Sequence, residues 1–209
     1  LPRFTVLRTE RGTTPYRRPP YSFIADGFLV SGDAACLTKP SAGEGVTSSM
    51  VQLEIAAEEI GRLLYEGGYL TRARLWPINV RYVAAQGKAF AGQLATLIGA
   101  MSTTAEENDI FFQHDIIFSD KTFAALACGE PLVFSKKEML HMAWVLLGGV
   151  LSRKVRLCTI RSLLRSMKNG ARAEQLYAQY PASEEEFDAW VLRAERFWKE
   201  CGSMAENEV

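Results

Sequence analysis

The sequence predicts a mainly helical chain with a few strands near its N-terminal end. Beyond residue 46, apolar residues recur at helical spacing over most of the chain, whereas short strand-like runs occur only before residue 31. Hydrophobic residues make up 48% of the 209 and charged residues 23%. This composition is typical of a globular protein and excludes a disordered chain.

The first strand-like signal with a clear environment is Phe28-Leu29-Val30, which is apolar without alternation. A run of this kind predicts a strand that is buried on both faces of a parallel sheet. Upstream, Pro19-Pro20 disfavours helix and predicts an extended path.

Residues 46–66 form the clearest predicted helix. Its apolar residues recur at steps of four and three and form one continuous stripe: Val46, Met50, Leu53, Ala57, Ile60 and Leu64. We expect this stripe to face the core and Gly67-Gly68 to end the helix.

The sequence beyond this helix predicts further helices. A long one is expected after Pro77, with core positions at Val83, Phe90, Leu94, Leu97 and Met101. Others are expected at 120–128, 136–151 and 153–168. The last helix is predicted to begin with Ser183 as N-cap and Glu186 as its capping-box partner, and to bury a face rich in Phe and Trp.

Charge and cysteine usage exclude several classes of protein. Lys and Arg (24) balance Asp and Glu (24), so no global basic field favours nucleic acid as a partner. Four scattered cysteines predict neither a disulfide framework nor a zinc or iron–sulfur site. The longest apolar run, 139–151, is too short to span a bilayer. We expect an intracellular, cytoplasmic protein.

The segment with the most chemical information runs from Gly32-Asp33-Ala34-Ala35 through Pro40 and Gly43-Glu44-Gly45 into the helix at Val46. It places a carboxylate after a strand, where open α/β sheets bind ligands. Glycines then lead to a helix N-terminus, whose free N–H groups and partial positive charge favour anions. An ionised Asp33 accepts hydrogen bonds from hydroxyls, such as those of a ribityl or ribose chain.

This segment resembles the second flavin-binding motif of FAD-dependent oxidoreductases with the aromatic-hydroxylase-like fold, most nearly the geranylgeranyl reductases. The resemblance covers about residues 15–66, with Cys36 where a Gly is common and Thr38-Lys39 where Asn is frequent before Pro. It implies that Asp33 contacts the ribityl–pyrophosphate region of FAD. It also implies that the backbone at Gly43, Gly45 and Val46 lies against the pyrimidine side of the flavin.

The resemblance implies an FAD-dependent reductase that acts on double bonds of an isoprenoid lipid. The cofactor-binding residues expected from the motif are Gly32, Asp33, Pro40, Gly43, Glu44, Gly45 and Val46. Its catalytic residues are not assigned. No G-x-G-x-x-G loop follows a strand in this sequence. We therefore expect the C-terminal part of an FAD-binding α/β, Rossmann-like flavoprotein, which needs an N-terminal half to hold FAD tightly. Residues 1–66 would belong to the FAD-binding domain and residues 67–209 to a helical region.

Several other interpretations stay open. The same cofactor motif serves flavin-dependent monooxygenases and halogenases, and dehydrogenases linked to electron-transfer flavoprotein. A chain of this kind could also be a helical interaction module, an inactive fragment, or a plain strand–turn–helix without a ligand.

Three further features of the sequence are candidate sites. His114-Asp115 lacks further ligands nearby, so we expect no metal. Cys36 is expected to be a small buried thiol rather than a redox centre. The basic stretch 153–172 has helical apolar spacing, which fits a helix lying on an anionic membrane. The alternative is a solvated face whose charge is balanced by the acidic last helix.

Overall fold

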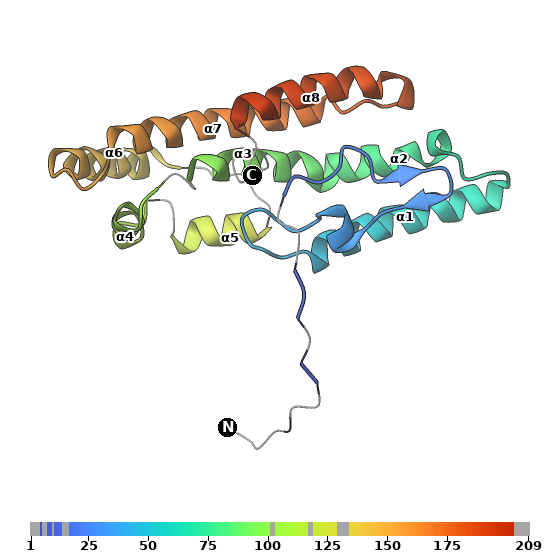
Figure 1. Ribbon diagram of the computed structural model, residues 1–209, viewed down its shortest axis with the longest axis horizontal. Coiled ribbons are helices and arrows are strands. Elements are labelled where there is room, and N and C mark those ends of the chain that lie inside the picture. Colours follow the sequence, from blue (N-terminus) through green and yellow to red (C-terminus); the bar gives the residue numbers. More distant parts are fainter. Residues whose placement is uncertain are drawn as a thin grey trace.

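The structure is a computed structural model that describes residues 5, 8–9, 11–13, 17–100, 103–116, 119–128 and 134–202. The expected core position Met101 lies outside the described residues. Helices form most of the described chain, in agreement with the predicted helical character. Figure 1 shows three layers: α7 and α8, then α2 and α3, then α1 with the hairpin and α5.

The strands form a small antiparallel hairpin, β1 (Ile24–Ala25) and β2 (Phe28–Leu29), so the predicted parallel strand at 28–30 is wrong within the described chain. Phe28 is 57% exposed, whereas the sequence predicted burial on both faces. A parallel strand is buried by flanking strands and helices, and no third strand pairs with this hairpin among the described residues.

The hairpin is fixed to α2 (Arg72–Tyr82) by a buried amide. Asn79 accepts a hydrogen bond from the Phe23 N–H at 3.0 Å and donates to Ser22 Oγ at 3.0 Å. At the start of the same helix, Asp26 accepts from the Arg72 N–H at 2.6 Å. These contacts hold the segment that leads into the predicted cofactor loop.

Helix α1 (Val46–Glu66) has the predicted bounds, but the predicted buried face is wrong. Along the apolar stripe, Val46 is 71%, Met50 64% and Leu53 49% exposed. The helix buries another face: Ser48, Gln52, Ile55, Ala56 and Leu63. Two of these residues are polar and are held by specific partners on neighbouring elements, so hydrophobic periodicity did not find them.

The helix expected after Pro77 begins earlier, at Arg72, with Thr71 accepting a hydrogen bond from the Arg74 N–H at 3.3 Å. It continues through a π-turn at Val83–Gly87 into α3 (Lys88–Ala100). Val83, Phe90 and Leu94 are buried as predicted. A single π-turn adds one extra residue to the helix and so shifts the helical register of α3 relative to α2.

The remaining helices are α4 (Ala105–Gln113), α5 (Asp120–Cys128), α6 (Lys136–Leu151), α7 (Leu157–Ala178) and α8 (Phe187–Cys201). The bounds of α5 and α6 match the prediction. Helix α7 begins four residues later and extends ten residues further than predicted. It continues past Gly170, where α3 approaches closely. A Cβ at Gly170 would lie 3.0 Å from the Gly92 carbonyl oxygen.

The predicted capping box at Ser183 and Glu186 is wrong. Ser183 precedes a short 3₁₀ turn, Glu184–Glu186, without a side-chain cap, and Glu186 itself is the N-cap of α8. The aromatic face of α8 is confirmed, with Phe187, Trp190, Phe197 and Trp198 buried.

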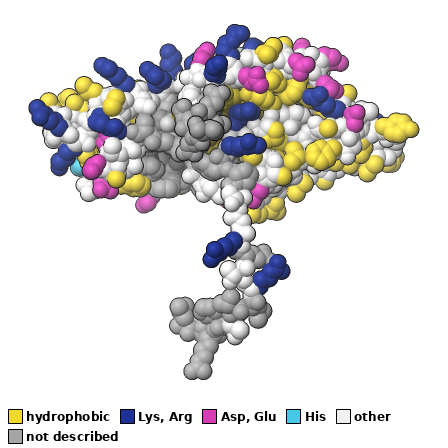
Figure 2. Space-filling view, viewed as in Figure 1, with side chains coloured by type: hydrophobic (Ala, Val, Ile, Leu, Met, Phe, Trp, Pro, Cys, Tyr) yellow, Lys and Arg dark blue, Asp and Glu magenta, His cyan; other side chains and the backbone are white. Residues whose placement is uncertain are grey.

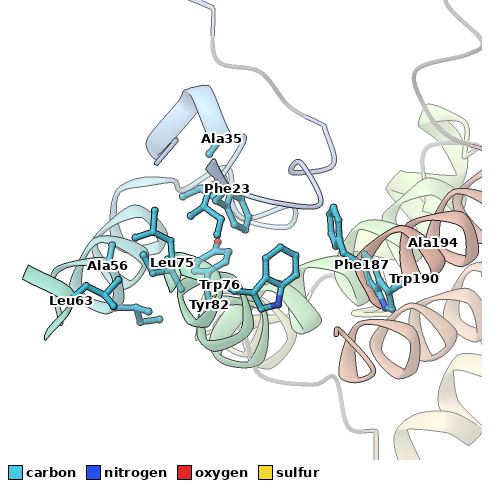
Figure 3. Packing of buried hydrophobic residues seen from close by; sticks show 14 residues of the cluster. Phe23, Ala35, Ala56, Leu63, Leu75, Trp76, Tyr82, Phe187, Trp190 and Ala194 are labelled. Carbon is cyan, nitrogen blue, oxygen red and sulfur yellow. The ribbon is translucent and has the colours of Figure 1, made fainter. Parts of the chain in front are cut away.

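The largest core cluster joins the hairpin, α1, α2 and α8. Figure 3 shows Trp76 of α2 beside Phe187 and Trp190 of α8; the Trp76 and Phe187 ring centroids are 5.1 Å apart. Phe23 and Tyr82 meet edge to face at 5.0 Å. This cluster includes residues from both sides of the proposed boundary at residue 66, and that boundary stays a prediction.

Candidate functional site

The predicted cofactor loop borders an open hollow of about 490 Å³. Five of the seven predicted residues line it: Gly32, Asp33, Gly43, Gly45 and Val46. The other two do not. Pro40 is buried, and the Glu44 carboxylate pairs with Lys39 Nζ at 3.1 Å.

Four lining residues were not predicted: Thr38, Ser49, Met50 and Leu53. The last three follow Val46 at helical spacing and lie on the same side of α1, so the periodicity could have identified them. No spacing pattern could have identified Thr38, because the fold of the loop, and not a helix, places it at the hollow.

The loop is closed by its own backbone. The Lys39 N–H donates to the Glu44 carbonyl at 2.8 Å and the Gly43 N–H to the Lys39 carbonyl at 3.0 Å. Gly43 has φ 69° and Cys36, which is 3% exposed, has φ 52°. Left-handed backbone favours glycine, which gives a physical reason for glycine at the position of Cys36 in similar motifs.

Glu44 fastens the loop to the start of α1 rather than facing the hollow. It accepts a hydrogen bond from Thr47 Oγ1 at 2.8 Å as well as from Lys39. These hydrogen bonds, first that of Thr47 and then that of Lys39, lower the pKa of the Glu44 carboxyl. Glu44 is therefore ionised at neutral pH and shapes the turn.

The N-terminus of α1 is open toward the hollow. Its N-cap is Gly45, which provides no side-chain cap for the first N–H groups of the helix. Uncapped N–H groups and the partial positive charge of a long helix favour an anionic or electron-rich ligand. Val46, the first helical residue, lies in the lining.

Gly45 leaves space that any other residue would occupy. A Cβ there would lie 3.3 Å from Thr38 Oγ1 and 3.6 Å from Asp33 Oδ1. Thr38 is 8% exposed, and its hydroxyl has no hydrogen-bond partner within the described part of the chain. An unsatisfied buried hydroxyl is costly, so this one is suited to a polar ligand atom. These residues fit a ligand with hydroxyl and carbonyl groups, as FAD has.

The opposite face of α1 supports the hollow from behind. Ser48 Oγ and Tyr82 Oη lie 3.0 Å apart, and Gln52 Nε2 donates to the Val30 carbonyl at 3.2 Å. Burial raises the pKa of Tyr82 to about 12, despite the opposing effect of Ser48, so the phenol stays neutral at ordinary pH. These contacts fix α1 between the hairpin and α2.

Neither histidine belongs to a group of possible metal ligands among the described residues. His141 Nε2 lies 3.2 Å from the His114 carbonyl oxygen, and the described residues contain no group of three or more His, Cys, Asp or Glu side chains placed to hold a metal ion.

Known proteins offer one informative similarity. No family model matches the chain. The digeranylgeranylglycerophospholipid reductase of Sulfolobus acidocaldarius is 29% identical over 181 residues, which cover 84% of this chain and 37% of that protein. The chain resembles an isoprenoid-lipid reductase. This similarity supports the enzyme class at family level, and the chain spans 37% of the length of the relative.

No helix in the described ranges has both the length and the hydropathy needed to cross a membrane.

Proposed function

We propose that this chain is the C-terminal part of an FAD-dependent oxidoreductase, similar to geranylgeranyl reductases, that reduces double bonds of an isoprenoid lipid. The observation that carries the proposal is the hollow at the start of α1, where Asp33, Thr38 and Gly45 meet an uncapped helix N-terminus. The similarity to a reductase of this class over most of the chain supports the substrate class.

In this proposal each side of the hollow has a separate task. Asp33 accepts hydrogen bonds from hydroxyls of the cofactor, and Thr38 Oγ1 supplies a further polar contact. Gly45 lets the ligand approach the backbone, and the N-terminus of α1 stabilises negative charge beside it. FAD, when bound, supplies the hydride for the reduction.

The exposed stripe of α1 supports a proposal for how the site would be completed. Val46, Met50 and Leu53 are exposed, and all three also line the hollow. Figure 2 shows hydrophobic side chains gathered over the end of the molecule where α1 and α2 lie. We propose that a dinucleotide-binding half packs on this stripe, which would bury it and close the hollow on its open side.

The test is the reaction of the complete protein with an isoprenoid lipid. We expect the purified protein to show the two visible absorption bands of oxidised flavin. With a chemical reductant, each double bond that is reduced should raise the mass of the lipid by two hydrogens. Incorporation of oxygen would favour the monooxygenase alternative, and a colourless protein that does not respond to FAD would contradict every flavoprotein interpretation.

A further inference from the structure

Helix α6 carries an apolar face that is exposed in the described part of the chain. Four residues at steps of four, three and four form a stripe with exposed fractions of 71, 79, 58 and 77%: Leu140, Trp144, Leu147 and Leu151. The opposite side of the helix packs into a core cluster with Phe111, Ile116 and Val155. Because α6 is anchored through that other side, its outer stripe stays exposed among the described residues and can meet a partner.

The first half of α7 continues this pattern. Ile160 and Leu163 pack into the same cluster as α6, while Leu157 and Leu164 are 58 and 63% exposed. The fully buried positions of α7 are small or polar: Thr159, Ser166, Gly170 and Ala173. Several of its larger apolar side chains are therefore exposed.

Basic side chains lie beside this apolar surface. Residues 151–173 contain seven basic residues and no acidic one. Two of the seven have ion pairs: Arg156 with Glu107 and Arg172 with Glu200. Three others are exposed and, among the described residues, have no ion-pair partner: Arg161, Arg165 and Lys168. In the alternative interpretation, the acidic last helix balances this charge. Of these five residues, Arg172 alone forms an ion pair with that helix among the described residues, through Glu200.

We propose that α6 and the first half of α7 dock on the surface of an anionic lipid bilayer. Figure 2 shows hydrophobic and basic side chains together at the end of the molecule where α6 and the start of α7 lie. Exposed Trp and Leu favour the boundary between headgroups and acyl chains, and cations beside them are attracted to anionic headgroups. An apolar protein partner would not need an unpaired basic row free of acidic residues. The docking does not depend on the flavin.

Trp144 is a built-in reporter for this docking. It is 79% exposed, whereas Trp76, Trp190 and Trp198 are at most 4% exposed, and the chain has four tryptophans. With vesicles of equimolar phosphatidylcholine and phosphatidylglycerol carrying brominated acyl chains, we expect quenching of the Trp144 fluorescence. Trp144→Phe should keep vesicle binding and lose the quenching. Absence of quenching in the unmodified protein would overturn the proposal.

A charge test separates a specific basic face from net charge. The triple variant Arg161→Gln, Arg165→Gln, Lys168→Gln should partition onto these vesicles about 100-fold more weakly. The matched control changes three exposed cations on α8 (Arg193→Gln, Arg196→Gln, Lys199→Gln) and should bind as the unmodified protein does. Equal loss in both triples would overturn the proposal. So would a dimer that Trp144→Ser dissociates without weakening vesicle binding, because the face would then belong to a second copy of the chain.

Discussion

Glu107 of α4 and Arg156, the residue before α7, form an ion pair at 2.8 Å in which the carboxylate is buried and the guanidinium half exposed. The same carboxylate accepts hydrogen bonds from the Arg156 N–H at 2.8 Å and from Thr159 Oγ1 at 2.8 Å. It also accepts from the Thr104 N–H. One acidic side chain thus fixes the start of both helices.

This arrangement predicts an acid-sensitive contribution to stability. Burial alone would raise the pKa of Glu107, but the hydrogen bonds from Arg156, Thr104 and Thr159 outweigh it and lower the pKa from 4.5 to about 2. A lowered pKa in the folded state stabilises the protein above pH 4.5, and this stabilisation is lost as the pH falls toward 2. Glu107→Gln should cost about 2 kcal/mol at neutral pH.

Urea unfolding of both proteins across pH checks this. The difference in the free energy of unfolding should shrink as the pH falls from 4.5 toward about 2, whereas the exposed neighbour variant Glu106→Gln should show little difference at any pH. A difference that is independent of pH would contradict the assigned role of the charge.

The space around two helical glycines, one at the contact of α3 with α7 and one in α6, predicts opposite effects of alanine. A Cβ at Gly170 would lie 3.0 Å from the Gly92 carbonyl oxygen, and a backbone atom cannot move aside cheaply. Gly170→Ala should therefore destabilise the protein by about 2 kcal/mol. Gly148 in α6 has open space around it, so Gly148→Ala should stabilise by about 1 kcal/mol. Thermal unfolding of the two variants measures both signs, and a stabilising Gly170→Ala would disprove the contact.

The two faces of α1 make a second matched pair. In this chain Leu63 is 2% exposed and Leu53 is 49% exposed. Leu63→Ala should cost about 3 kcal/mol in the free energy of unfolding, and Leu53→Ala within about 0.5 kcal/mol. If denaturant unfolding of the isolated chain shows equal losses of unfolding free energy in both variants, the predicted inward-facing stripe would be correct after all.

Sequence patterns predicted where most helices lie, but not every contact that they make. The bounds of α1 followed from its periodicity and from Gly67, whereas its buried face depended on Ser48 and Gln52, whose partners Tyr82 and Val30 are distant in sequence. The strand predicted at 28–30 pairs antiparallel with Ile24–Ala25, because an apolar run does not by itself specify the strand with which it pairs.

The cofactor loop was predictable in part for a related reason. Glycines and an acid at fixed spacing indicated where a ligand could approach the backbone, and five of these residues do line one hollow. Thr38 was missed because its inward side chain depends on the left-handed turn at Cys36 and on the hydrogen bonds that close residues 39–44. The spacing of residues along the sequence does not reveal this turn.

Filling the space at Gly45 should weaken FAD binding without unfolding the protein. Its φ of −113° suits alanine, but the new Cβ would lie 3.3 Å from Thr38 Oγ1. Gly45→Ala in the complete protein should therefore lower FAD retention while changing stability by about 0.5 kcal/mol at most. Gly61→Ala, farther along the same helix with open space around it, should leave FAD retention unchanged. Equal FAD retention in both variants would remove Gly45 from the site.

The most direct measurement is the dissociation constant of FAD for the complete protein with Asp33→Ala, by fluorescence titration. Loss of a hydrogen bond to a charged group predicts binding weaker by about 10- to 100-fold. Glu54→Gln, which removes an exposed carboxylate from α1, should bind FAD as the unmodified protein does. If Asp33→Ala binds FAD as tightly as the control, the hollow at the start of α1 does not hold the flavin.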